Sequence, residues 1–230
     1  KTPLDFSKSH PQSFFNESMR TVRTGVLLSS LDTEKKIIVV TSSIPGEGKS
    51  TTAMNLASSI AEINKVLLLD ADMRRPTIGK IFALDKKANG ISECVSQSEK
   101  LNDCIHQIDG GNLYVMPSGR IPPNPLELLS SHRFADTLAE LSGMFDQIII
   151  DSPPALSVSD ALVLSTHASG VIYVVKADST PYMLPQDGLK RIMKYNNDII
   201  RCVLNEVTTH NKSGYGSYYG GIYHYSYNES

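Results

Sequence analysis

The amino-acid sequence predicts an α/β fold in which a doubly wound, mostly parallel sheet lies between two layers of helices. Two observations lead to this three-layer architecture. Short, continuous apolar runs recur along the chain, and amphipathic stretches with helical spacing separate them. Continuous apolar strands are typical of a parallel sheet, because helices cover both of its faces. With 230 residues the chain is long enough to bury a full hydrophobic core, so a single domain suffices.

The expected elements follow one another in a regular order. Pro3, Pro11 and mostly polar neighbours predict an extended lead-in over residues 1–15, and helical spacing runs from Phe14 to Leu31. The apolar runs predict strands at residues 37–40, 66–69, 113–116, 148–150, 171–175 and 199–204. Amphipathic spacing predicts further helices at residues 49–63, 132–144, 159–167 and 185–195.

The last segment, Ser213 to Ser230, differs from the rest of the chain. It alternates Gly, Ser and Tyr and has no aliphatic periodicity, so we expect it to be mobile and solvated. We therefore predict a folded domain over residues 1–212 and a tail over residues 213–230. Of the 10 tyrosines in the chain, the tail holds Tyr215, Tyr218, Tyr219, Tyr223, Tyr225 and Tyr227.

The composition excludes several classes of function. The chain has 22 Lys and Arg against 24 Asp and Glu, so its net charge of −2 does not favour nucleic acid as a partner. Its three cysteines form no CxxC pair, which suggests a reducing compartment and neither a disulfide framework nor a zinc site. We find no apolar stretch of about 18 to 20 residues and no signal peptide, so we expect the chain itself to be soluble. Because the first residue is not Met, we also expect a fragment cut from a longer polypeptide.

A phosphate-binding motif follows the first predicted strand. Residues 43–50 read Ser-Ile-Pro-Gly-Glu-Gly-Lys-Ser, which is the Walker A pattern with Ser43 at the first glycine position. Such a loop cradles phosphates with its backbone N–H groups, so the fold is predicted to be P-loop NTPase-like and its nucleotide to be ATP. Ser43 fits if its backbone is not left-handed. The predicted nucleotide contacts are Pro45, Gly46, Glu47, Gly48, Lys49, Ser50 and Thr51.

A dinucleotide-binding site is an alternative interpretation of the same segment. Gly46, Gly48 and an acidic residue about 20 positions further on, Asp70, imitate the fingerprint of NAD-dependent dehydrogenases. The third glycine of that fingerprint is absent. Lys49 and Ser50 also stand where such an enzyme needs close backbone packing, so the sequence favours the phosphate loop. Bound NAD would decide for the dehydrogenase.

Carboxylates follow two further apolar runs. Asp70 and Asp72 come after Leu67-Leu68-Leu69, and Asp151 comes after Ile148-Ile149-Ile150. In an open parallel sheet, ligands lie beyond the carboxyl ends of the strands, and carboxylates there hold Mg²⁺ or its waters. The sequence therefore predicts a Mg²⁺ site formed by Ser50, Asp70, Asp72 and Asp151.

The predicted chemistry is phosphoryl transfer. Lys49 would stabilise the transferring γ-phosphoryl group, and a carboxylate would take the proton of the attacking hydroxyl. A tyrosine hydroxyl has a pKa of about 10, so it benefits from such a base at neutral pH. Asp70 is the first candidate for the base and Asp72 the second catalytic carboxylate. The sequence leaves open which carboxylate has which role.

These motifs together resemble the bacterial tyrosine kinases of capsule and exopolysaccharide export. The resemblance rests on the Walker A loop, on Asp70-Ala71-Asp72-Met73-Arg74, on Pro122 to Leu129, on Asp151-Ser152-Pro153-Pro154 and on the terminal tyrosines. It implies autophosphorylation of the tail tyrosines and regulation of polysaccharide synthesis and export. It also implies a membrane-spanning co-polymerase region or adaptor as partner, a cognate tyrosine phosphatase, and a location at the cytoplasmic face of the plasma membrane.

The resemblance also assigns residues outside the phosphate loop. Glu17, Arg20 and Arg23 match the family's E-x-x-R-x-x-R segment, which implies contacts between subunits of a ring-like homo-oligomer such as an octamer. Spacing alone would instead suggest a solvated helix face with weak ion pairs. Asn205 stands where the wider P-loop ATPase group places an adenine contact.

A partition or division-positioning ATPase is the alternative within the P-loop class. Such proteins act as nucleotide-gated switches without kinase activity. They carry a second lysine five residues before the catalytic one, and this chain has Ile44 at that position. The missing lysine and the tyrosine-rich tail favour the kinase.

Overall fold

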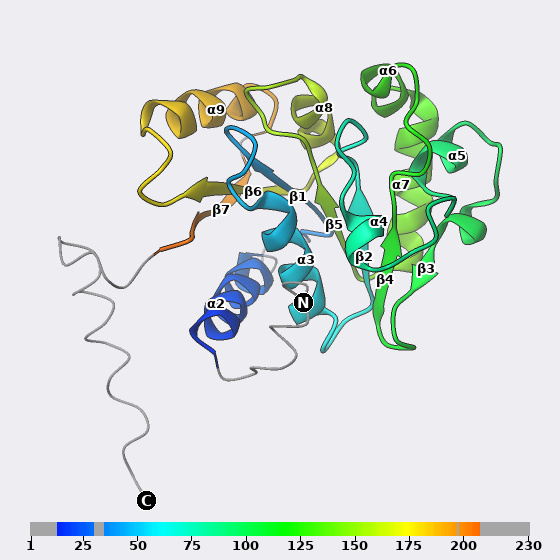
Figure 1. The fold of residues 1–230 in the computed structure, drawn as a ribbon, viewed down its shortest axis with the longest axis horizontal. Coiled ribbons are helices and arrows are strands. Elements are labelled where there is room, and N and C mark those ends of the chain that lie inside the picture. The colour runs from blue at the N-terminus through cyan, green and yellow to red at the C-terminus, as the bar shows by residue number, and fades with distance from the viewer. Residues whose placement is uncertain (1–12, 30–34, 197, 208–230) are drawn as a thin grey trace, which may run out of the picture.

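The sheet lies at the centre of the computed structural model, which describes residues 13–29, 35–196 and 198–207. Its seven strands have the order β3-β4-β2-β5-β1-β6-β7 (Figure 1). All neighbouring strands are parallel except β3 and β4. The predicted doubly wound, mostly parallel sheet is therefore confirmed. The strands are β1 (Ile37–Ser42), β2 (Val66–Asp70), β3 (His106–Gln107), β4 (Leu113–Met116), β5 (Gln147–Asp151), β6 (Gly170–Lys176) and β7 (Ile199–Asn205).

Helices cover both faces of this sheet. One face packs against α2 (Phe14–Ser29), α3 (Lys49–Ile60) and α4 (Ile78–Ile81). The other face packs against α5 (Ile91–Val95), the short 3-10 helix η1 (Leu101–Cys104), α6 (Pro125–Leu129), α7 (His132–Met144), α8 (Asp160–His167) and α9 (Met183–Met193). Figure 1 shows the resulting three layers.

Successive side chains of a strand point to opposite faces of the sheet, and here both faces are covered by helices, so the apolar runs are continuous. In β1, Ile38 and Val40 point into the core beneath α3, whereas Val39 points into the core beneath α7. All three side chains are fully buried. A strand between two helical layers needs apolar residues on both faces, and this removes the alternation seen in half-exposed strands.

Five short elements lie outside the sequence prediction. They are α4, α5, η1, β3 and α6, each of five residues or fewer. Segments this short do not show a period, so spacing alone does not reveal them. Local signals exist at α6, where Asn124 accepts a hydrogen bond from the Glu127 N–H at 3.3 Å and Pro125 opens the helix.

The long elements agree with the prediction and differ at their ends. The strand expected at residues 148–150 extends to Asp151, and that expected at 66–69 extends to Asp70. The helix expected at 49–63 ends at Ile60. Each acidic residue thus forms the last position of its strand and pairs with the neighbouring strand. Because β2 ends at Asp70 and β5 ends at Asp151, both carboxylates lie at the edge of the sheet where the parallel strands end.

Strand register brings the three motifs together. Val40, two residues before the end of β1, is the partner of Asp151 in β5, and Asp151 is in turn the partner of Asp70 in β2. Parallel strands end at the same edge of a sheet, so the loop after β1 and both acidic strand ends meet there.

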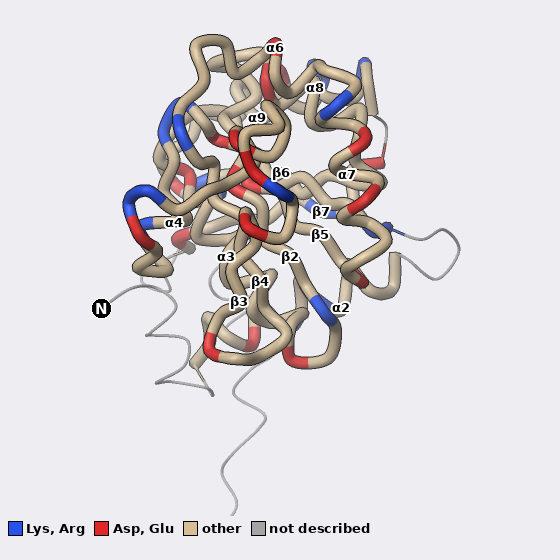
Figure 2. The backbone as a smooth tube through the Cα atoms, turned by 90° about the vertical axis from the view of Figure 1, so that its right-hand side faces the viewer, with Lys and Arg blue, Asp and Glu red and all other residues tan. Residues whose placement is uncertain are grey.

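Charge is distributed along the whole described backbone. Lys and Arg segments are interspersed with Asp and Glu segments (Figure 2), in keeping with the net charge of −2. Among the described residues, no helix has the length and apolar character to cross a membrane.

Candidate nucleotide and phosphotransfer site

The loop between β1 and α3 has the backbone shape that phosphate binding needs. Gly46 and Gly48 have φ angles of 86° and 89°, a region that favours glycine. A Cβ atom at Gly48 would lie 2.0 Å from Asn205 Nδ2, so a larger residue does not fit. Ser43 does not have a positive φ angle, which meets the condition for its place at the first glycine position. The N-terminus of α3 carries no side-chain cap, as expected where an anion is to bind.

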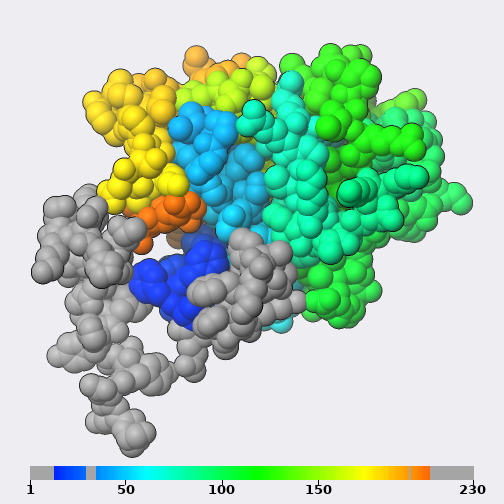
Figure 3. All heavy atoms as spheres, viewed as in Figure 1, coloured from blue at the N-terminus to red at the C-terminus, as the bar shows by residue number. Residues whose placement is uncertain are grey.

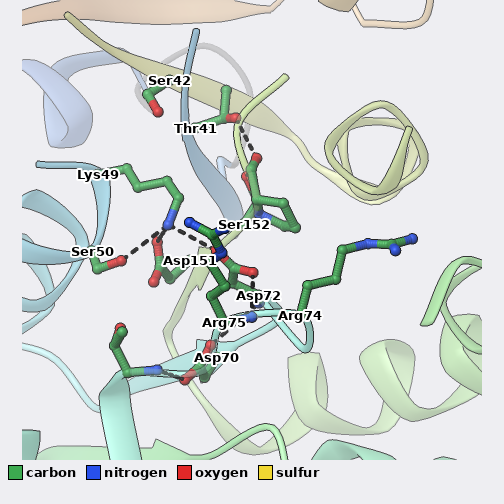
Figure 4. A network of polar contacts seen from close by, with 12 residues as sticks. Thr41, Ser42, Lys49, Ser50, Asp70, Asp72, Arg74, Arg75, Asp151 and Ser152 are labelled. Atoms are coloured by element: carbon green, nitrogen blue, oxygen red, sulfur yellow. Dashed lines mark hydrogen bonds and ion pairs between the residues drawn. The ribbon is translucent and has the colours of Figure 1, made fainter. Parts of the chain in front are cut away.

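Lys49 lies at the centre of the site (Figure 4). Its Nζ atom is 3.0 Å from Asp72 Oδ2 and 3.9 Å from Asp151 Oδ1. It also donates a hydrogen bond to Ser50 Oγ at 3.2 Å. Burial lowers the pKa of Lys49, but the negative charges of Asp151 and Asp72 outweigh it and raise the pKa overall. The lysine therefore stays charged in this pocket.

Asp70 is buried and its oxygens already accept backbone hydrogen bonds. Oδ2 accepts from the N–H groups of Thr77 at 3.1 Å and Ile78 at 3.0 Å, and Oδ1 accepts from the Asp72 N–H at 3.2 Å. Burial raises the pKa of Asp70 to about 7, and the nearby charge of Asp151 adds to this. Asp70 thus holds the turn after β2 in shape, in addition to any role in proton transfer.

Asp151 is the most unusual group in the site. It is fully buried, and neither of its carboxylate oxygens accepts a hydrogen bond from the described part of the chain. Burial raises its pKa to about 6, although the charge of Lys49 opposes the shift. Its ion-pair partner among the described residues is Lys49 Nζ, at 3.9 Å, and a buried carboxylate without hydrogen bonds costs free energy unless cations compensate its charge. The two orphaned oxygens therefore fit a Mg²⁺ ligand.

Part of the predicted donor set fits a loosely held Mg²⁺. Among the described residues, no group of three or more His, Cys, Asp or Glu side chains is arranged to hold a metal ion. Magnesium in phosphoryl-transfer sites keeps several waters and takes one or two carboxylates together with substrate phosphates. Asp151 and the Ser50 hydroxyl suit this arrangement, with Asp70 and Asp72 close by.

An ion pair that the sequence did not reveal supports the turn after β2. Arg74 donates from Nε to Asp160 Oδ2 at 2.8 Å and from Nη2 to Asp160 Oδ1 at 3.0 Å. Asp160 is fully buried at the first turn of α8, where the helix dipole favours a carboxylate. These residues are 86 positions apart, so no local pattern could pair them.

Asn205 and Glu47 lie beside the glycines of the loop. Asn205 Nδ2 donates to the backbone oxygen of Glu47 at 3.1 Å, and the Glu47 side chain is buried. Pro45 and Gly46 are exposed, whereas Thr51 is half-buried in the first turn of α3. The structure thus brings together every predicted nucleotide contact, although Glu47 turns its carboxylate inward.

Comparison with known proteins identifies the family. The model of a family described as "AAA domain" matches residues 35–208. Tyrosine-protein kinase YwqD of Bacillus subtilis is 35% identical over 92% of this chain and 89% of that protein. The putative tyrosine-protein kinase CapB of Staphylococcus aureus is 32% identical over 91% of this chain and 92% of that protein. The chain belongs to the bacterial tyrosine-protein kinases.

Solved structures agree with this assignment. The chimerical protein CapA2B2 matches the kinase with a TM-score of 0.83 and 34% identity, over 87% of this chain and 88% of that one. The predicted family and enzyme class are therefore confirmed, and the dehydrogenase alternative is wrong. The cell division ATPase MinD of Pyrococcus furiosus has a TM-score of 0.62 at 21% identity, over 74% of this chain and 71% of that one, which shows a shared fold alone.

The three residues predicted to form subunit contacts lie on α2. Glu17 Oε2 accepts from Arg20 Nη1 at 3.1 Å on the exposed side of α2. Arg23 instead reaches α3, where Nη1 donates to the backbone oxygen of Ser59 at 2.7 Å and pairs with Glu62. The six tail tyrosines lie outside the described residues.

Proposed function

We propose that this kinase transfers the γ-phosphoryl group of ATP to tyrosine hydroxyls, with its own tail tyrosines as the first substrates. The observation that carries the proposal is the position of Lys49 between Asp72 and Asp151. Lys49 directly follows the glycine loop, whose backbone has the shape that phosphate binding needs. The proposal includes a catalytic domain over residues 1–212 and a substrate tail over residues 213–230. ATP is held by residues 45–51 and Asn205.

Each residue then has a definite role. Lys49 exchanges its ion pair with Asp72 for the β- and γ-phosphates, which leaves the Asp72 carboxylate free. Bound Mg²⁺, held by Ser50 and Asp151 with Asp70 and Asp72 nearby, would neutralise charge on the phosphate oxygens. As the tyrosine oxygen bonds to the γ-phosphorus, the bond to the bridging oxygen breaks and ADP leaves.

The proton of the tyrosine hydroxyl passes to a carboxylate. Asp72 and Asp70 are both candidates for this base. Asp72 is favoured by geometry, since one of its oxygens contacts Lys49 rather than backbone N–H groups. Burial raises the pKa of Asp70, but both of its oxygens already accept backbone N–H groups that hold the turn after β2.

The proposal extends to the biological setting. The chain spans 30% of the tyrosine-protein kinase wzc of Salmonella typhimurium, whose sequence is 28% identical over 95% of this chain. This ratio supports a partner that supplies a membrane-spanning region, either fused or as an adaptor. We place the kinase at the cytoplasmic face of the plasma membrane, in a ring-like homo-oligomer that regulates capsule or exopolysaccharide export, with a cognate tyrosine phosphatase that reverses its action.

Incubation of the purified chain with γ-labelled ATP and Mg²⁺ tests the proposal. We expect label on tyrosines of residues 213–230, located by peptide mapping. Lys49→Met is the control, because it removes the phosphate contact while leaving the apolar core untouched. Label confined to serine or threonine, or equal labelling of the Lys49→Met chain, would contradict the assignment.

A further inference from the structure

Glu47 occupies an unexpected place for an acidic residue of a phosphate loop. Its neighbours Pro45 and Gly46 are exposed, whereas Glu47 is 1% exposed. Its carboxylate turns away from the loop's outer face and accepts three hydrogen bonds. Oε2 accepts from the Ile44 N–H at 2.8 Å, and Oε1 accepts from the Thr180 hydroxyl at 2.7 Å and the Lys176 N–H at 3.4 Å.

These contacts fasten the loop to the segment that follows β6. Thr180 is 133 residues away from Glu47 in sequence. A second contact joins the same parts, because the Glu47 backbone oxygen accepts from Asn205 Nδ2 at the end of β7. The Ala177 N–H donates to the Asn205 backbone oxygen at 2.9 Å, which links the two anchoring segments to each other. Figure 3 shows the surface of the loop region beside the yellow surface of the segment after β6.

Attraction between charges does not explain why Glu47 is acidic. A carboxylate in a loop that receives phosphates adds repulsion, and in the described residues no Lys or Arg pairs with Glu47. Its three partners are neutral donors. Charge-assisted bonds to such donors are short and directional, so a carboxylate holds geometry better than a neutral side chain does. The role that fits is therefore geometric.

We propose that Glu47 is a positioning residue that sets nucleotide affinity by fastening the phosphate loop to Thr180. The Ile44 bond closes the loop on itself, across the residues that precede Gly48. The Thr180 bond holds the closed loop in a fixed position against the segment after β6. This inference rests on the proposed nucleotide site and adds a determinant of its affinity.

Four variants separate this role from general stability. Glu47→Ala removes all three acceptor contacts, and Thr180→Val removes one donor with little change of shape. Glu47→Gln keeps an oxygen for the Ile44 N–H, and its NH₂ group can donate to the Thr180 hydroxyl. Glu140→Ala, at an exposed position of α7, is the matched control for loss of a carboxylate.

The measurement is the dissociation constant for Mg²⁺-ADP by calorimetry, together with the melting temperature of the nucleotide-free chain. We expect Glu47→Ala to weaken ADP binding about tenfold or more and Glu47→Gln to stay within about threefold of the original. Thr180→Val should weaken binding by a smaller factor, and the double variant with Glu47→Ala should bind no worse than Glu47→Ala alone. Glu140→Ala should bind like the original.

Two results would overturn the inference. One is unchanged ADP binding in Glu47→Ala, and the other is additive loss in the double variant, which would mean that the two side chains act independently. If Glu47→Ala does not fold, the other two variants still decide: unchanged ADP binding in Thr180→Val, or a loss of about tenfold or more in Glu47→Gln, would also overturn it. Absence of ADP binding in the original chain would refute the proposed function itself, which keeps the two failures distinguishable.

Discussion

The buried carboxylate of Asp151 lowers the stability of the nucleotide-free kinase, although it suits the proposed metal site. Asp151 has two oxygens without hydrogen bonds, and Lys49 Nζ is 3.9 Å away. Burial raises the pKa of Asp151 to about 6, so the folded chain binds that proton more tightly than the unfolded chain does. The free energy of unfolding that depends on this group is therefore highest at low pH and falls as the pH rises through the folded pKa.

Replacement of Asp151 by Asn should make the nucleotide-free chain more stable. Above about pH 7 we expect a gain of roughly 1–3 kcal/mol, because a buried ionised group is removed, and the gain should disappear toward about pH 4. The same variant should bind Mg²⁺-ADP more weakly. Urea unfolding across this pH range measures the first effect and calorimetry the second.

Asp136→Asn, at an exposed position of α7, is the control for loss of a carboxylate. It should change neither quantity. A stability difference between Asp151→Asn and the original chain that is the same at every pH would contradict the assignment of the shifted proton to Asp151.

At the scale of elements, the turn after β2 is held from two directions. Asp70 accepts the N–H groups that open α4, and Arg74 reaches across to α8. The turn carries Asp72, so both anchors fix the carboxylate that contacts Lys49. The end of β2 and the start of α8 therefore act as one rigid support.

Arg74→Lys should loosen that support. A lysine cannot make the two parallel bonds to Asp160, which would remain buried with an incomplete partner set. We expect a loss of about 1–3 kcal/mol in the free energy of unfolding and faster amide hydrogen exchange in the turn after β2. Arg120→Lys is the control, because the Arg120 side chain is 93% exposed. Equal stability of the two variants would contradict the role of the pair.

At the scale of the whole molecule, α2 has two different sides. Arg23 fastens it to α3, whereas Glu17 and Arg20 form an exposed pair that is 55% and 41% accessible. The proposed subunit contact therefore rests on Glu17 and Arg20 more directly than on Arg23.

Arg20→Ala should reduce assembly without a measurable loss of stability, because exposed pairs contribute roughly 0–1 kcal/mol. Arg23→Ala should destabilise the fold as well, since α2 loses the Arg23 bonds to Ser59 and Glu62. Sedimentation and urea unfolding separate the effects. Lys190→Ala is the control, as Lys190 forms a comparable exposed pair with Asp187 on α9. Unchanged sedimentation of Arg20→Ala at matched nucleotide concentration would remove Arg20 from the interface.

Phosphoryl transfer should take place mostly between subunits. A chain of 18 residues without regular structure would reach roughly 20–25 Å, and in the proposed ring a neighbouring tail would then enter the site at high effective concentration. The test mixes Lys49→Met chains that keep their tyrosines with active chains whose six tail tyrosines are Phe. We expect label on the Lys49→Met chains. Complete absence of label there, with both chains folded and assembled, would contradict transfer between subunits.

Phosphorylation of the tail should then loosen the assembly. Each phosphotyrosine adds about −1.5 to −2 charges, which repel one another and the carboxylates of the site. We expect the sedimentation coefficient to fall as labelling proceeds. An assembly that stays intact at full phosphorylation would contradict this effect.

The sequence by itself determined the parallel part of the sheet, the order of the motifs along the chain and the position of Lys49, Asp72 and Asp151 at one edge, but not the short antiparallel strand β3. These features follow from local patterns, because period, turn residues and the position after an apolar run are all visible within a few residues. Parallel pairing then places every strand end at the same edge.

Only the tertiary structure decided which polar groups are already satisfied. Asp70 and Asp151 follow similar apolar runs, yet the Asp70 carboxylate accepts three N–H groups and the Asp151 carboxylate accepts none among the described residues. Glu47 accepts a hydrogen bond from Thr180, and Arg74 donates to Asp160, although the members of each pair are far apart in the sequence. The physical reason is that a side chain's partners depend on strand order and loop packing, which bring together residues that no local pattern connects.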